Sequence, residues 1–123
     1  MVKKIALVDD ENDIREILRH AIELLTDWKV IEAPDGVTAL RLIEQERPDA
    51  ILLDVMMPQM DGREVFRRLR ENPETSSIPT IFLTASLQRA DVRILEGLGP
   101  VAVLAKPFDP LEIVKQIRKL LGW

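Results

Sequence analysis

The sequence has 123 residues, a length typical of a single domain, and 46% of them are hydrophobic, which suffices for an ordinary buried core. It has no cysteine, which excludes disulfides and thiolate metal sites, and its formal net charge of -4 argues against nucleic acid as a partner. No apolar run approaches the roughly 20 residues of a membrane span and the N-terminus lacks a signal-peptide pattern, so we expect one cytoplasmic domain over residues 1–123 with no membrane partner.

Five short apolar runs predict β-strands. Four of them are nearly continuous in apolar residues, as in parallel strands that are covered on both faces. The second run interleaves Lys29 and Glu32 with apolar residues, so we expect it at an edge of the sheet. The five runs are 3–10, 28–33, 49–54, 79–85 and 101–106.

Segments of helical period lie between these runs. Apolar residues from Ile14 to Leu25, Ile17 among them, repeat at spacings of three and four and predict one buried helix face. A weaker repeat runs from Val37 to Ile43. The fourth helix, expected at about 87–98, has less regular apolar spacing.

Two further helices carry start signals. Asp61 is the expected N-cap of a helix that ends near Asn72, because Glu64 follows three residues later. Asp109 is the expected N-cap of the last helix, in which Pro110 takes the first helical position. The apolar residues of that last helix, including Leu120, are expected to be buried.

Strands that alternate with helices predict a single (βα)5 domain, in which a doubly wound parallel sheet is covered by helices on both faces. Trp28, which opens the second run, is expected to cover the edge of the sheet. Trp123 is expected to be a loose terminal residue. The fold class is therefore α/β.

Polar residues close four of the five runs. The first ends in Asp9 and Asp10, the third in Asp54 and the fifth in Lys106, and the fourth has Thr84 near its end. Ligands of open α/β sheets bind beyond the carboxyl ends of the strands. We therefore expect these side chains to converge on one edge of the sheet.

The types of side chain indicate phosphoryl chemistry. Neighbouring carboxylates without Cys or His suit a hard cation, Mg²⁺ or Mn²⁺. Lys106 offers a positive charge for an anion and Thr84 a hydroxyl donor. Asp54, which follows four apolar residues, is then the central oxygen nucleophile. Taken singly, Asp54 could instead cap a turn, Thr84 could be an ordinary strand residue and Lys106 could be solvated.

The chain resembles the receiver domain of bacterial two-component response regulators over essentially its whole length. The resemblance rests on LVDDE (7–11), ILLDVMMPQMDG (51–62), TA (84–85) and KPF (106–108), in the order and spacing of that family. Each motif alone is weak, whereas the four together are specific. The resemblance implies a flavodoxin-like fold with strand order 2-1-3-4-5.

The resemblance also implies the roles of individual residues. Asp9 and Asp10 would hold Mg²⁺ together with Asp54 and the main-chain carbonyl of Met56. Asp54 would be phosphorylated by a partner that carries a phosphohistidine, either a histidine kinase or a phosphotransfer protein. Because the Met56 side chain has no group to orient an attacking water, we expect slow loss of the phosphoryl group.

The same resemblance assigns the switch. Thr84 would be the hydroxyl that moves toward the phosphoryl group, Lys106 would pair with the phosphoryl oxygens, and the bond between Lys106 and Pro107 would be cis. Val103 stands where the family often has an aromatic residue that reports activation. The partner face implied by the family combines the fourth helix, the fifth strand and the fifth helix. The downstream target and a phosphorylation-dependent dimer are left open.

We therefore predict a phosphoacceptor signalling domain, with at most self-phosphorylation from small donors and slow autodephosphorylation as its own chemistry. The chain is either a stand-alone receiver or a module of a larger regulator or hybrid histidine kinase. An aspartate-nucleophile phosphatase is a weaker hypothesis, because it needs an acid where this chain has Met56. A module that only binds partners is also weaker, because it would not need Asp10, Asp54, Thr84 and Lys106 together.

Overall fold

The computed structural model describes residues 2–85, 93 and 102–123. Five parallel strands form one sheet in the order β2-β1-β3-β4-β5. The strands are β1 (Lys4–Val8), β2 (Lys29–Ala33), β3 (Ala50–Asp54), β4 (Thr80–Thr84) and β5 (Ala102–Ala105). The predicted α/β fold, its strand order and the edge position of the second strand are confirmed.

Each strand is shorter than the apolar run that predicted it. β1 and β5 end before the polar residues Asp9 and Lys106, whereas Asp54 and Thr84 are the last residues of β3 and β4. Some pairing continues past the strand ends. The Asp9 N–H donates to the Ala33 carbonyl at 3.2 Å and the Lys106 N–H donates to the Thr84 carbonyl at 2.8 Å. The main chain of Asp9 and Lys106 is therefore held by a neighbouring strand, although neither residue belongs to one.

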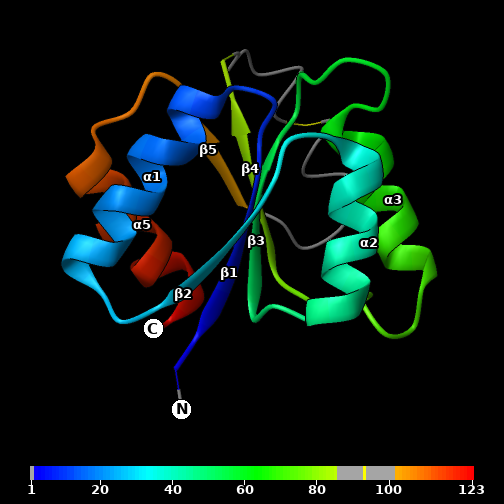
Figure 1. The fold of residues 1–123 in the computed structure, drawn as a ribbon, viewed down its shortest axis with the longest axis horizontal. Coiled ribbons are helices and arrows are strands. Elements are labelled where there is room, and N and C mark those ends of the chain that lie inside the picture. Colours follow the sequence, from blue (N-terminus) through cyan, green and yellow to red (C-terminus); the bar gives the residue numbers. More distant parts are fainter. Residues whose placement is uncertain (1, 86–92, 94–101) are drawn as a thin grey trace.

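Helices cover both faces of the sheet (Figure 1). The helices α1 (Asn12–Leu25) and α5 (Pro110–Leu121) lie on one face, and α2 (Gly36–Glu46) and α3 (Gly62–Glu71) on the other. The helix expected at 87–98 falls outside the described residues except for residue 93. In the part of the chain that the structure describes, no helix is long and apolar enough to cross a membrane.

The predicted N-caps are confirmed. The Asp61 carboxylate accepts hydrogen bonds from the N–H groups of Arg63 at 2.8 Å and Glu64 at 3.2 Å. The Asp109 carboxylate caps α5 in the same way at 2.9 and 3.2 Å. Because such caps satisfy N–H groups that the helix itself leaves free, they determine where α3 and α5 begin.

Successive strand residues contribute to two separate cores, because side chains alternate across a sheet. Val8, Leu53 and Phe82 pack with residues of α2 and α3. Their neighbours Leu7, Leu52 and Leu83 pack with residues of α1 and α5. All of these side chains are buried, so the sheet is covered on both faces and its carboxyl end is left for polar groups.

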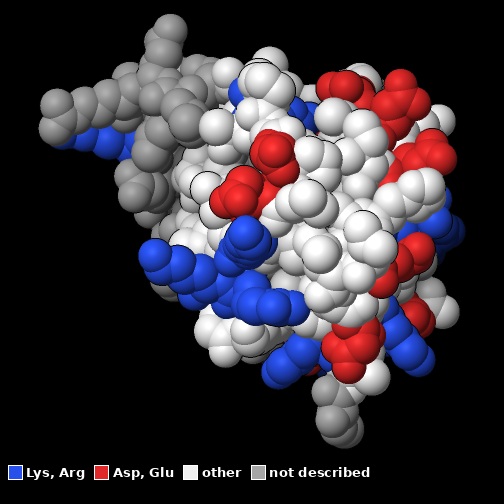
Figure 2. Space-filling model, turned by 90° about the vertical axis from the view of Figure 1, so that its left-hand side faces the viewer, with Lys and Arg blue, Asp and Glu red and all other residues white. Residues whose placement is uncertain are grey.

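Several expectations about packing are wrong. Ile17 and Leu25 in α1 are 43% and 42% exposed and Leu120 in α5 is 49% exposed, because the buried stripes of α1 and α5 are narrower than their apolar stripes. Figure 2 shows the side of the molecule on which α1 and α5 lie, where uncharged surface lies between acidic and basic side chains. Trp123 is not loose, because its ring packs edge-on against Trp28 with 4.9 Å between ring centroids.

Candidate functional site

The loop from β1 to α1 presents Asp9 and Asp10 at the carboxyl end of the sheet. Asp9 is 2% exposed, and its Oδ1 accepts a hydrogen bond from the Glu11 N–H at 2.9 Å. Asp10, the next residue, is exposed. The first acid is thus fixed by burial and hydrogen bonding, while the second is exposed on the same turn.

Asp54 ends the central strand β3 and is 3% exposed. The loop that follows returns close to it, because the Gly62 N–H donates to the Val55 carbonyl at 2.8 Å. A Cβ atom on Gly62 would lie 2.2 Å from the Asp54 main-chain oxygen, a distance that no side chain tolerates. A glycine is therefore required here by close approach, and it brings the start of α3 against the Asp54 main chain.

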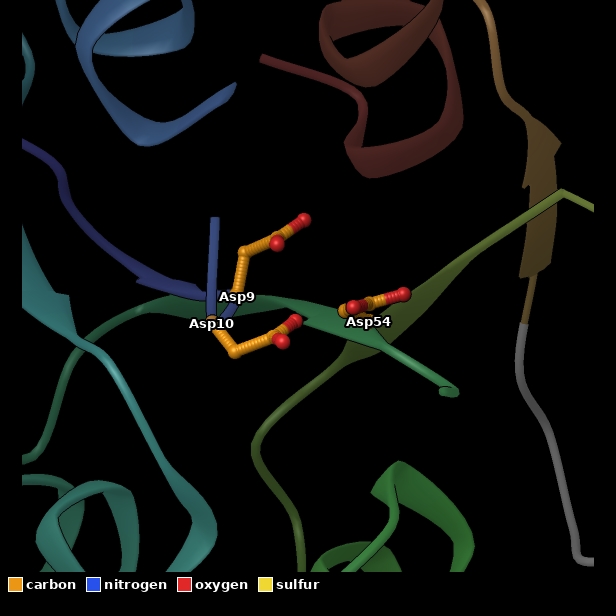
Figure 3. Close-up of side chains that lie close together, drawn as sticks. All are labelled: Asp9, Asp10 and Asp54. Atoms are coloured by element: carbon orange, nitrogen blue, oxygen red, sulfur yellow. The ribbon is translucent and has the colours of Figure 1, made fainter. Parts of the chain in front are cut away.

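The three aspartates form one cluster (Figure 3). Asp9, Asp10 and Asp54 each offer a carboxylate oxygen, and these atoms all lie within 4.8 Å of one another. β1 and β3 are adjacent in the sheet, so the cluster depends on the pairing of two strands that are far apart in the sequence.

Lys106 contributes the positive charge of the site. Its Nζ lies 2.8 Å from Asp9 Oδ2 and 3.3 Å from Asp54 Oδ1, and its side chain is 12% exposed. Glu11 Oε1 lies 3.8 Å from the same nitrogen. The bond between Lys106 and Pro107 is cis, as the family resemblance implied. One lysine therefore bridges the ends of β1 and β3 from the end of β5.

The negative charges of the cluster oppose ionisation of Asp54. Burial, and then the charge of Asp9, raise the pKa of Asp54 to about 7, against the lowering effect of Lys106. Burial disfavours the ammonium form of Lys106, but its contacts with Asp9 and Asp54 raise the pKa of that amine overall. The site therefore holds more negative charge than one lysine neutralises.

This excess of carboxylate oxygens fits a hard divalent cation. Mg²⁺ takes one or two carboxylates, keeps several waters and also binds phosphate oxygens. Asp10 leaves one side of the cluster exposed, so an ion and its waters have access. The fit rests on the donor atoms, all of which are oxygen, and on their mutual distances.

The remaining predicted residues surround the cluster. Thr84 ends β4, next to β3, and is 4% exposed. Met56 follows Asp54 by two residues, its side chain is 70% exposed, and its N–H lies within hydrogen-bonding range of the Asp54 carboxylate. Val103 lies in β5 and packs at the margin of the core under α2 and α3.

Sequence reasoning missed three contributors to this site. Gly62 was not assigned a role of its own, although a glycine allows the close approach of main chain that occurs here. Glu11 was not expected to approach Lys106. Arg15, whose guanidinium donates to the Asp9 carbonyl, has no local signal at all, because its contact exists only once α1 packs on the sheet.

Comparison with known proteins places the chain among signalling proteins. Residues 5–118 match the family model of the response regulator receiver domain. The alkaline phosphatase synthesis transcriptional regulatory protein PhoP of Bacillus subtilis (strain 168) is 39% identical over 121 residues, which make up 98% of this chain and 49% of PhoP. The chain spans about half the length of the first curated relatives that it matches.

Solved structures agree with this similarity. The chemotaxis protein CheY4 of Vibrio cholerae has a TM-score of 0.90 and 28% identity, over 98% of this chain and 99% of CheY4. The receiver domain of the sensor histidine kinase PA1611 from Pseudomonas aeruginosa PAO1 has a TM-score of 0.86 and 29% identity over 100% of both chains. In that neighbour a magnesium ion is coordinated in the active site cleft.

Proposed function

The chain belongs to the response regulator receiver domain family of two-component systems, and on this premise we propose that it accepts a phosphoryl group on Asp54. The observation that carries the proposal is the position of the Asp54 carboxylate. It is buried at the end of the central strand, 3.3 Å from Lys106 Nζ and within 4.8 Å of ligand atoms of Asp9 and Asp10.

In the proposed reaction an Asp54 carboxylate oxygen attacks phosphorus. The new P–O bond forms as the P–N bond of a phosphohistidine donor breaks, and the departing imidazole nitrogen keeps the bonding electron pair. With acetyl phosphate as donor, a P–O bond breaks and acetate leaves. We propose a histidine kinase or a histidine phosphotransfer protein as the natural donor, in keeping with the receiver family.

Asp9, Asp10, Asp54 and the Met56 main-chain carbonyl are the proposed ligands of Mg²⁺. When bound, the ion would neutralise part of the carboxylate charge and of the incoming phosphoryl oxygens. Lys106, whose Nζ already contacts Asp9 and Asp54, would turn to a phosphoryl oxygen and stabilise the charge there. Thr84 would donate its hydroxyl to another phosphoryl oxygen.

The proposed output is a change of surface. Thr84 and Lys106 close β4 and β5, so their movement toward a phosphoryl group would alter the surface formed by β5 and α5. We propose that a protein partner reads this change. Val103 in β5 stands where many relatives have an aromatic side chain that changes its rotamer on activation, and it has no ring to do so. Thr84 would therefore be the residue that carries the switch.

Intact-protein mass spectrometry tests the proposal. The chain is incubated with acetyl phosphate, with and without Mg²⁺, beside Asp54→Asn and a matched control, Asp27→Asn, which changes an exposed acid away from the cluster. We expect one Mg²⁺-dependent phosphate adduct that hydroxylamine removes, present in the wild type and in Asp27→Asn and absent in Asp54→Asn. An undiminished adduct in Asp54→Asn would contradict the assignment of Asp54 as the phosphorylated residue.

A further inference from the structure

The Arg15 side chain connects the aspartate cluster to the edge of the sheet. Arg15 lies near the start of α1, and only 11% of its side chain is exposed. Its Nη1 donates to the main-chain carbonyl of Asp9, and its Nη2 donates to Asn12 Oδ1. A buried guanidinium needs such specific partners, because an arginine side chain otherwise remains solvated.

Glu32 holds Arg15 from the opposite side. Arg15 Nε lies 3.4 Å from Glu32 Oε1, and Glu32 belongs to the edge strand β2, in register with Leu7 of β1. The next residue of β2, Ala33, accepts the Asp9 N–H at 3.2 Å. The main chain of Asp9 is therefore held at its N–H by β2 directly and at its carbonyl by β2 through Arg15.

The Asp9 carbonyl belongs to the peptide group that joins Asp9 to Asp10. Because a peptide group is planar and includes the next Cα atom, a hydrogen bond to its oxygen also restrains the position of the Asp10 Cα. Among the described residues, no hydrogen bond or ion pair holds the exposed Asp10 carboxylate. The direction of that carboxylate therefore depends on the peptide plane, and the plane depends on Arg15.

We propose that Arg15 is a positioning residue for the cation site. By holding the Asp9 carbonyl, it orients the peptide between the two acids so that both carboxylates face Asp54. The inference rests on the proposed function, because it assumes that Asp9 and Asp10 bind Mg²⁺. It adds a residue that lies outside the acidic cluster and touches neither the ion nor the phosphoryl group.

The direction of the change in cation affinity on removal of Arg15 distinguishes a positioning role from a purely electrostatic one. Arg15 is a positive charge close to a proposed cation site, so on charge alone its removal should tighten cation binding. If Arg15 positions the acids, its removal should weaken binding despite the lost repulsion. The two explanations therefore predict opposite changes in the same dissociation constant.

Arg19 provides a matched control on the same helix. Its Nε lies 3.1 Å from Glu32 Oε2, so it pairs with the same acid. In the described part of the chain, Arg19 makes no hydrogen bond to Asp9. Arg15→Gln and Arg19→Gln each remove one positive charge and one contact with Glu32, but only Arg15→Gln frees the Asp9 carbonyl.

Calorimetric titration with MgCl₂ at pH 8, repeated with Mn²⁺, measures the effect on the full unphosphorylated chain. We expect Arg15→Gln to weaken cation binding roughly tenfold, as for other residues that orient metal ligands, and Arg19→Gln to stay within about twofold. Arg15→Lys should also bind more weakly than the wild type, because an ammonium lacks the planar fork that reaches Asp9, Asn12 and Glu32 together. Circular dichroism during urea unfolding establishes that each variant is folded.

The outcomes are distinguishable. Cation binding by Arg15→Gln that equals or exceeds that of the wild type would overturn the positioning role while leaving phosphorylation of Asp54 intact. Equal weakening in Arg15→Gln and Arg19→Gln would also overturn it, because loss of the Glu32 pair would then explain both. If Arg15→Gln does not fold, unchanged binding by Arg15→Lys would overturn the role. A wild type that binds no cation and forms no phosphate adduct would overturn the proposed function and this inference together.

Discussion

At the carboxyl end of the sheet Asp9, Asp54 and Lys106 are nearly buried charges, whereas the amino end is closed by the ring contact of Trp28 with Trp123. The first end holds more carboxylates than its one lysine can pair. At the second, Lys3 lies 5.4 Å from the centroid of the Trp123 ring and Arg118 lies 5.7 Å from that of the Trp28 ring. Opposing charges thus gather at the carboxyl end of the sheet, whereas aromatic rings pack against each other at the amino end.

The physical reason is the cost of burying charge. Like charges in a partly buried cluster oppose each other, and that opposition appears in the raised pKa of Asp54. An edge-to-face aromatic pair, by contrast, contributes about 0.5 to 1.5 kcal/mol beyond the area that it buries. Substitutions at the two ends should therefore affect stability and phosphorylation in different proportions.

The largest effect is expected for Gly62→Ala. The new Cβ would meet the Asp54 main-chain oxygen at 2.2 Å, so the loop after β3 must move and the Asp54 main chain with it. We expect a loss of about 3 kcal/mol in the free energy of unfolding, measured in urea. Phosphate labelling of any folded protein should also fall.

Gly122→Ala is the matched control at the other end of the molecule. Gly122 has φ +72°, and a Cβ there would meet nothing within 4 Å. Its substitution should cost only about 1 kcal/mol, from the left-handed backbone alone, and should leave labelling unchanged. Equal losses for the two glycines would contradict the importance of the contact with Asp54.

Trp123→Ala should produce the next largest effect. It removes the ring contact with Trp28 and the cation contact with Lys3, so we expect a loss of about 2 kcal/mol in the free energy of unfolding. Labelling by acetyl phosphate should be retained in the folded fraction, because the ring lies at the end of the sheet opposite the aspartates. Selective loss of labelling would show that the two ends are coupled.

The smallest effect, and the only gain in the free energy of unfolding, is expected for Asp54→Asn in the absence of metal. Since the pKa of Asp54 is raised from 3.8 to about 7, the native state binds more protons than the unfolded state between these values. Stability is therefore lost as the pH rises through this range. We expect Asp54→Asn to gain about 1 kcal/mol, or roughly 3 to 6 °C in Tm, at pH 8.

Thermal unfolding at several pH values and with EDTA measures this gain. It should shrink as the pH falls and disappear below about pH 3, where the wild-type carboxyl is protonated in both states, and Mg²⁺ should stabilise the wild type more than the variant. Asp27→Asn, which changes an exposed acid, should show no such pH dependence. A wild type that becomes more stable than Asp54→Asn between pH 4 and 8 would contradict a raised pKa.

Much of the site was predictable because its residues close apolar strands. Asp9, Asp10, Asp54, Thr84 and Lys106 each follow or end such a run, and parallel strands bring their carboxyl ends together. The capping acids Asp61 and Asp109 were predictable for a similar reason, since an N-cap acts on N–H groups two or three residues away. Both kinds of signal are local in the sequence.

Contacts between separate elements of the fold were not predictable in this way. The buried stripe of α1 excludes Ile17, and that of α5 excludes Leu120, because the width of each stripe depends on how the neighbouring helix packs. Trp123 was expected to be loose, yet it lies against Trp28, 95 residues earlier in the chain. The contact of Gly62 with Asp54 likewise depends on the course of a whole loop.

The sequence by itself determined the alternation of strands and helices, the start of two helices and the acids and lysine at the strand ends, because periodicity, capping and strand length act over a few residues. Only the tertiary structure decided which charges meet, how deeply they are buried and what holds them. The pairing of Lys106 with Asp9 and Asp54 joins the ends of three strands. The hydrogen bond from Arg15 to the Asp9 carbonyl requires α1 to pack beside β1 and β2. These contacts depend on three-dimensional distance, which no short stretch of sequence encodes.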